Sequence, residues 1–86
     1  MSNRIRTFTV YRRGDLSATH DKVQWTGPDE PQFDGAVFAD GTCVLRWCAA
    51  VGSTSVWASL EDAFAVHGHP EERYGTEIIW HEGGES

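Results

Sequence analysis

Apolar and polar residues alternate over residues 5–12, IRTFTVYR, near the start of the chain. Phe8 and Val10 fall on one side of an extended backbone, and the threonines fall on the other. A period of two with β-branched and aromatic residues predicts a β-strand. The segment TEIIWHE alternates in the same way, with Ile78 and Trp80 on one face, and predicts a last strand.

The segment GAVFADGTCVLRWC, residues 35–48, contains Asp40-Gly41 between two apolar runs. Asp-Gly suits the two positive φ angles of a type I′ turn, so a β-hairpin with a two-residue loop is predicted. Phe38 would then oppose Cys43. The face expected to point into the core carries Ala36, Phe38, Cys43, Leu45 and Trp47.

A short strand over 54–57 and then a helix are predicted from STSVWASLEDAFAVHG. Ser59 is a favourable N-cap, and acidic residues in the first turn suit the helix dipole. Leu60, Phe64 and His67 recur at helical spacing, so this stripe should face the sheet.

The sequence HGHP, residues 67–70, ends that helix and contains two of the four histidines. Gly68 is expected to supply a left-handed residue just past the last turn, and Pro70 prevents continuation. A metal site would instead need His67 or His69 to converge with His81 or a cysteine. The spacing matches none of the usual zinc patterns, so we expect neither a metal nor a cofactor.

These segments predict an α+β fold: a mainly antiparallel sheet of about five strands in the order ββββαβ, with one short helix on one face. Residues 1–86 should form a single small domain. Within it, residues 13–34 are expected to be a long acidic loop and residues 83–86 a frayed tail.

The net charge is −6, yet residues 1–13 carry four arginines and no acid. An acidic body disfavours sequence-independent binding to phosphate backbones, which argues against nucleic acid as a partner. Neither a signal peptide nor an apolar run of about 20 residues is evident, so no membrane association is expected. Cys43 and Cys48 are an odd number of residues apart in one strand and cannot pair there, which favours a reduced, cytoplasmic protein.

The chain lacks the Gly-x-Ser-x-Gly, His-Glu-x-x-His and glycine-rich phosphate-loop motifs, so we expect no catalytic residues and no enzyme activity. Trp25 stands in the polar loop without a partner at strand or helix spacing. It either covers the small core or anchors a partner protein. The residues expected to contact a partner are Trp25, Asp29, Glu30 and Phe33.

The motifs DGAVFADGTCVLRWC, STSVWASLEDAFAVHGHP and TEIIWHE together resemble a group of short proteins from actinobacterial phages and prophages. The resemblance covers roughly residues 34–82 and the first strand. It implies a phage setting and no particular reaction. Residues 13–34 differ from the group pattern, so a partner reached through that loop could be particular to this chain.

We therefore expect a small non-enzymatic interaction protein of phage type that binds a host or phage protein, or a second copy of itself as a homodimer. The alternative is a small-ligand or nucleotide-sequestering module that uses Trp57, His67 and His69 near the helix end. A third class is a DNA mimic or nucleic-acid binder, which would use the acidic body or the arginine-rich strand.

Overall fold

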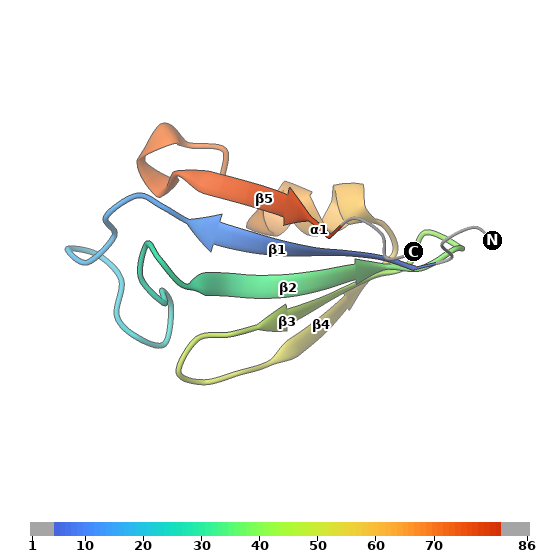
Figure 1. The fold of residues 1–86 in the computed structure, drawn as a ribbon, viewed down its shortest axis with the longest axis horizontal. Coiled ribbons are helices and arrows are strands. Elements are labelled where there is room, and N and C mark those ends of the chain that lie inside the picture. Colours follow the sequence, from blue (N-terminus) through green and yellow to red (C-terminus); the bar gives the residue numbers. More distant parts are fainter. Residues whose placement is uncertain (1–4, 82–86) are drawn as a thin grey trace.

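The first strand lies inside the sheet, next to the last strand of the chain (Figure 1). The computed structural model describes residues 5–81. Its elements are β1 (Arg6–Arg12), β2 (Pro31–Val37), β3 (Cys43–Trp47), β4 (Thr54–Trp57), α1 (Leu60–His67), the 3₁₀ turn η1 (Glu72–Tyr74) and β5 (Thr76–Trp80). The strand order is β4-β3-β2-β1-β5, and every neighbouring pair is antiparallel. The predicted α+β class and five-stranded antiparallel sheet are confirmed; the predicted tail 83–86 lies outside the described residues.

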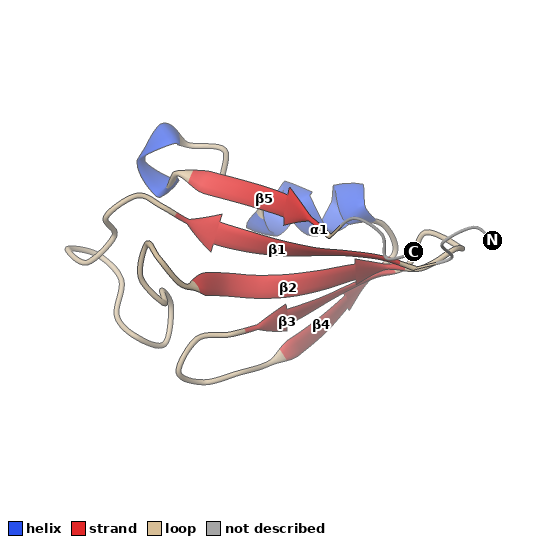
Figure 2. Ribbon diagram, in the orientation of Figure 1, coloured by secondary structure: helices blue, strands red, loops and turns tan. Residues whose placement is uncertain are grey.

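The helix α1 covers one face of the sheet, and the other face is open (Figure 2). In Figure 1 the view is onto the open face, with α1 behind it. The connections 13–30, 48–53 and 68–75 gather at one end of the sheet (Figure 1). This end of the sheet is where β1 and β3 stop and β2 and β5 start.

The core forms between the sheet and α1 around the ring of Phe8. This ring meets Phe64 and Trp80 edge-on, with centroid separations of 5.9 and 4.9 Å. It also lies over Gly35, where a Cβ atom would be 2.6 Å or less from three ring carbons. The fully buried core residues are Phe8, Val10, Phe33, Cys43, Leu45 and Ala63.

The hairpin between β2 and β3 forms at the predicted place with a different register. Phe38 N–H donates to Thr42 O and Gly41 N–H donates to Phe38 O, so the loop has three residues and the prediction of a type I′ turn was wrong. Within this three-residue loop only Gly41 takes a positive φ, +96°. This three-residue loop is the next most common hairpin type.

The different register turns over the side chains of β2, because neighbouring residues of a strand point to opposite faces. Gly35 pairs with Leu45, and Ala36 pairs with Val44 on the open face. Phe38, which we expected in the core, is 40% exposed. The observed register keeps the charged Asp34 out of the core, since Asp34 has the same parity as Ala36.

The long loop ends at residue 30, four residues earlier than predicted, because β2 begins at Pro31. Phe33 is therefore a strand residue and is completely buried, and it offers no surface to a partner. Leu16, an apolar residue of the loop, is buried, with 5% exposure. The remaining loop, residues 13–30, is acidic and is connected to β1 and β2 by hydrogen bonds.

The close approach of Phe8 to Gly35 can be tested with Gly35→Ala. The added methyl group would displace a core ring, so we expect the free energy of unfolding to fall by about 1–3 kcal/mol in a urea titration. Gly52→Ala is the matched control, because a Cβ there meets the flexible tip of Arg46 at 3.0 Å. Equal unfolding midpoints for the two variants would contradict this packing.

Candidate functional site

A pocket of about 300 Å³ lies at the end of the sheet where the loops gather. Strand β1, the start of β2, the loop 13–30, the end of α1 and the turn η1 all contribute to it. Its polar lining residues are Arg12, His20, Gln24, Gln32, His67, His69 and Tyr74. Three of the four histidines thus line the same pocket as one arginine.

Arg12 forms the inner wall of this pocket and is only 4% exposed. Its position follows from the alternation of β1, which directs Phe8, Val10 and Arg12 to the same face. Nη1 donates to Thr76 Oγ1 at 2.9 Å, and Nη2 donates to the carbonyl oxygen of His67 at 2.7 Å. These bonds join β1 to β5 and to the last turn of α1.

Within the described range 5–81, no carboxylate lies in direct contact with the Arg12 guanidinium. Among residues 5–81 the ion pairs are Arg13–Glu77 and His69–Glu71, and neither includes Arg12. Burial lowers the pKa of Arg12, while Tyr74 and the more distant Glu71 act to raise it. Arginine nevertheless stays protonated in proteins, so the pocket wall carries a cation.

His67 lies between two tryptophans at the edge of the pocket. Its ring centre is 4.9 Å from that of Trp47 and 5.4 Å from that of Trp57, both edge-on. Burial lowers the pKa of His67, and the nearby charges of His69 and Arg12 lower it further. His67 is therefore neutral near pH 7.

The helix ends at His67 as predicted, and Ser59 caps its start by accepting a bond from Asp62 N–H. Gly68, however, is right-handed at φ −73° and continues the turn, donating its N–H to Phe64 O. The left-handed residue is His69, with φ +44°. The role expected of Gly68 therefore belongs to the next residue, because the chain reverses one position later.

His69 is held in this backbone conformation by its side chain and its carbonyl group. The imidazole stacks on Tyr74 with centroids 4.4 Å apart and planes 7° from parallel. The carbonyl oxygen of His69 accepts a bond from Thr76 Oγ1 at 2.9 Å. His20 packs edge-on against Tyr74, with ring centroids 5.7 Å apart, so both histidines pack against the same tyrosine ring.

A second, more apolar depression of about 510 Å³ adjoins the pocket. Val23, Ala49 and Val51 line it, and Trp47 and His67 line both hollows. Val23 and Val51 are 52% and 63% exposed. The end of the sheet thus has a cationic hollow and an apolar hollow with a shared aromatic wall.

The residues predicted for binding are not gathered at one place. Trp25 is partly buried, and its Nε1 donates to the carbonyl oxygen of Arg12 at 3.1 Å. Asp29 and Glu30 are exposed in the loop. Of the residues predicted for a small ligand, His67 contacts Trp57, whereas His69 lies against Tyr74.

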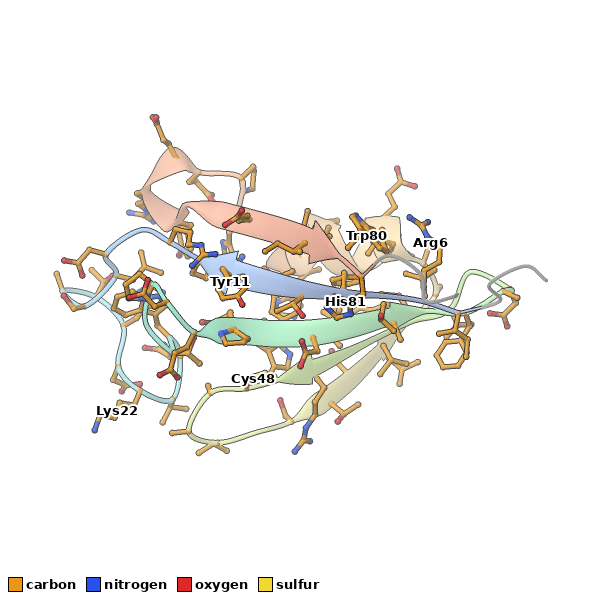
Figure 3. The ribbon with its side chains drawn as sticks, in the orientation of Figure 1. Arg6, Tyr11, Lys22, Cys48, Trp80 and His81 are labelled. Atoms are coloured by element: carbon orange, nitrogen blue, oxygen red, sulfur yellow. The ribbon has the colours of Figure 1, made fainter. Side chains whose placement is uncertain are left out.

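The open face of the sheet carries a hydrogen-bonded row across three strands. Thr9 donates to Asp34 Oδ1 at 2.7 Å, so its single proton is used and His81 Nε2, 2.8 Å away, must donate to Thr9. In the neutral ring, Nδ1 then accepts from Thr7 at 2.7 Å. Figure 3 shows His81 over β1 on this face.

The thiol nearest to this row is Cys48, whose Sγ lies 3.7 Å from Asp34 Oδ2. Burial raises the pKa of Cys48, and the charge of Asp34 adds to the effect. The thiol therefore stays protonated at neutral pH and is a weak nucleophile. Among residues 5–81 no three histidine, cysteine or acidic side chains converge as metal ligands.

Apolar side chains form a second row on the open face. Val44 lies between Ala36 of β2 and Val56 of β4. Ile5, Phe38 and Val44 border a shallow depression beside the hairpin loop. Val56, Ile5 and Phe38 are 68%, 50% and 40% exposed.

A family model described as "Acb5 phage protein" matches residues 33–82, more than half of the chain. The chain belongs to the Acb5 phage protein family. The predicted phage setting is thereby confirmed. The matched range begins within β2 and holds β3, β4, α1 and β5, whereas β1 and the loop 13–30 precede it.

No curated protein and no solved structure matches the chain. Within the described part of this Acb5 chain, none of the helices has the length and apolar character needed to span a membrane.

The strain at His69 can be measured with two substitutions. Both His69→Ala and His69→Gly remove the stacking on Tyr74, but only alanine keeps a side chain at positive φ. We expect His69→Gly to be more stable than His69→Ala by about 1 kcal/mol in chemical unfolding. A His69→Ala variant as stable as His69→Gly would show that the backbone at this position is not left-handed.

Proposed function

We propose that this Acb5 chain is a small non-enzymatic protein that binds a host or phage protein through the open face of its sheet. In the proposed setting it acts in the cytoplasm of an actinobacterial host, as the sequence resemblance implies. The observation that carries the proposal is the exposed apolar row on a face that no helix covers.

This row joins Ile5, Ala36, Phe38, Val44 and Val56 on the open face. Val44 and its cross-strand neighbours continue into Ile5 and Phe38, so the apolar side chains are adjacent to one another. Small monomeric proteins rarely expose contiguous apolar patches beyond a few hundred Å², and larger patches mark interaction sites. A partner that covers these side chains would bury them as a second packed layer.

The polar row beside it suits the rim of an interface. Mutual hydrogen bonds fix the side chains of Thr7, Thr9, Asp34 and His81. A further bond joins Arg46 Nη1 to Thr54 Oγ1 at 3.1 Å. Fixed side chains lose little entropy on binding, and a polar rim around an apolar centre is typical of protein interfaces. The net charge of −6 favours association with a partner of basic surface.

The contact residues proposed from sequence fall into two groups, exposed acidic residues of the loop and aromatic residues that are wholly or partly buried. Asp29 and Glu30 are exposed and can still meet a partner from the loop. Trp25 is tied to β1 through its indole nitrogen, so it acts as part of the core cover. The open face replaces Phe33 and Trp25 as the proposed centre of contact.

The test is affinity capture from lysates of infected and uninfected host cells. We expect the double variant Phe38→Ser/Val56→Lys to lose the proteins that the original chain retains, with a loss of at least tenfold. Both positions are exposed, so folding stability should change by no more than about 0.5 kcal/mol each.

The control is Val66→Ser, which changes a 55% exposed valine on α1 away from the open face. It should retain every captured protein, and so should Trp25→Ala if it remains folded. Capture by the double variant equal to that by the control would contradict the proposed contact face.

A second copy of the chain is the alternative partner for this face. Sedimentation equilibrium separates the two cases: a dimer that the Phe38→Ser/Val56→Lys variant abolishes identifies self-association. A monomer in both proteins leaves a host or phage protein as the partner.

A further inference from the structure

We propose that the pocket around Arg12 binds a small phosphate-bearing molecule with an aromatic ring, such as a mononucleotide. The phosphate would lie against Arg12 and the histidines, and the ring would lie in the adjoining depression beside Trp47. This site is independent of the open face of the sheet.

The first argument is the unbalanced cation. A buried charge is costly unless it is paired, and the hydrogen-bond partners of the buried Arg12 among residues 5–81 are one hydroxyl and one carbonyl oxygen. The rings of Phe33 and Tyr74, with centroids 5.6 and 5.8 Å from Cζ, offset the charge only in part. These two bonds use two of the five N–H donors of a guanidinium. Because the group lines the pocket, an oxyanion there would accept from the others and supply the missing charge.

The second argument is that three histidines line the pocket together with Arg12. His20, His67 and His69 come from three separate positions along the chain and line the same hollow. A neutral imidazole still donates from one ring nitrogen, so these three rings can add N–H donors to those of Arg12 around an oxyanion.

One acidic group opposes an anion in this pocket. Glu71 lies 3.7 Å from Nδ1 of His69 and acts on Arg12 through its charge. It is half-exposed and makes no side-chain cap for η1, so its charge can be removed without disturbing the fold. Its removal should therefore improve anion binding.

The third argument is the shape and chemistry of the double hollow. Hollows of about 300 and 510 Å³ meet at Trp47 and His67. Valine and alanine side chains line the larger one together with Gln24, Ser53 and Ser55. The indole of Trp47 offers a face or edge for a flat ring. A phosphate alone would leave the apolar hollow unfilled.

The first experiment measures the melting temperature of the full chain in sodium sulfate and in sodium chloride at equal ionic strength. Sulfate keeps its charge between pH 5.5 and 7.5, so any pH dependence comes from the protein. The pKa of His67 is lowered in the folded chain. In chloride, the stability that its neutral ring contributes is therefore fully present above the unfolded pKa and is lost as the pH falls through the folded pKa. Bound sulfate should offset that loss, and the gain in melting temperature should be larger at pH 5.5 than at pH 7.5.

The second experiment compares ligands by isothermal titration calorimetry at pH 7. Adenosine 5′-monophosphate should bind at least tenfold more tightly than inorganic phosphate and than adenosine, because only the nucleotide fills both hollows. Affinity for the nucleotide no higher than for phosphate or adenosine would overturn the proposal.

Variants separate binding at this pocket from general screening of charge. Glu71→Gln should tighten nucleotide binding by about two- to fivefold, which loss of structure cannot imitate. His67→Gln should weaken it, and Arg12→Gln should abolish it if that variant folds. Arg46→Gln removes an exposed arginine on the open face and should leave the affinity unchanged. Equal nucleotide affinity in Glu71→Gln, His67→Gln and Arg46→Gln, or no sulfate effect at any pH, would overturn the proposal.

Discussion

The buried guanidinium of Arg12 is the interaction on which the end of this molecule depends. It holds the last turn of α1 and the start of β5 against strand β1 through two hydrogen bonds. The backbone next to this contact turns at His69, which has a positive φ. The carbonyl oxygen of His69 accepts a hydrogen bond from Thr76 Oγ1, the same hydroxyl group that Arg12 contacts. A charge that organises three elements without a contacting carboxylate is also a charge that an anion can complete.

This arrangement separates two surfaces with different chemistry. The open face, with Val44 and Val56, is flat, apolar and edged by fixed polar groups. The pocket at the end of the sheet is concave, cationic and lined by imidazoles. A protein partner and a small anion would therefore occupy different parts of the molecule. Substitutions can abolish binding at one of these surfaces without affecting binding at the other.

Local signals in the sequence predicted much of the fold. The alternation around Phe8 predicted β1, and Ser59 predicted the start of α1, because strand periodicity and helix capping depend on neighbours in the chain. The hairpin register was wrong because Asp-Gly suits both two- and three-residue loops, and the choice rests on burying Phe33 and giving Phe8 room over Gly35. That is a contact between strands.

The site shows the same limit. His67 and His69 were found from the end of the helix, but their meeting with Arg12 and His20 depends on β1 and the loop 13–30 reaching the same end of the sheet. An arginine on the core-facing side of β1 was the one visible signal. The most direct test of the account is the pKa of His67, followed by NMR of its ring in chloride and in sulfate. The account predicts a value below that of a free histidine in chloride and a rise in sulfate; a pKa that is normal in chloride and unchanged by sulfate would contradict it.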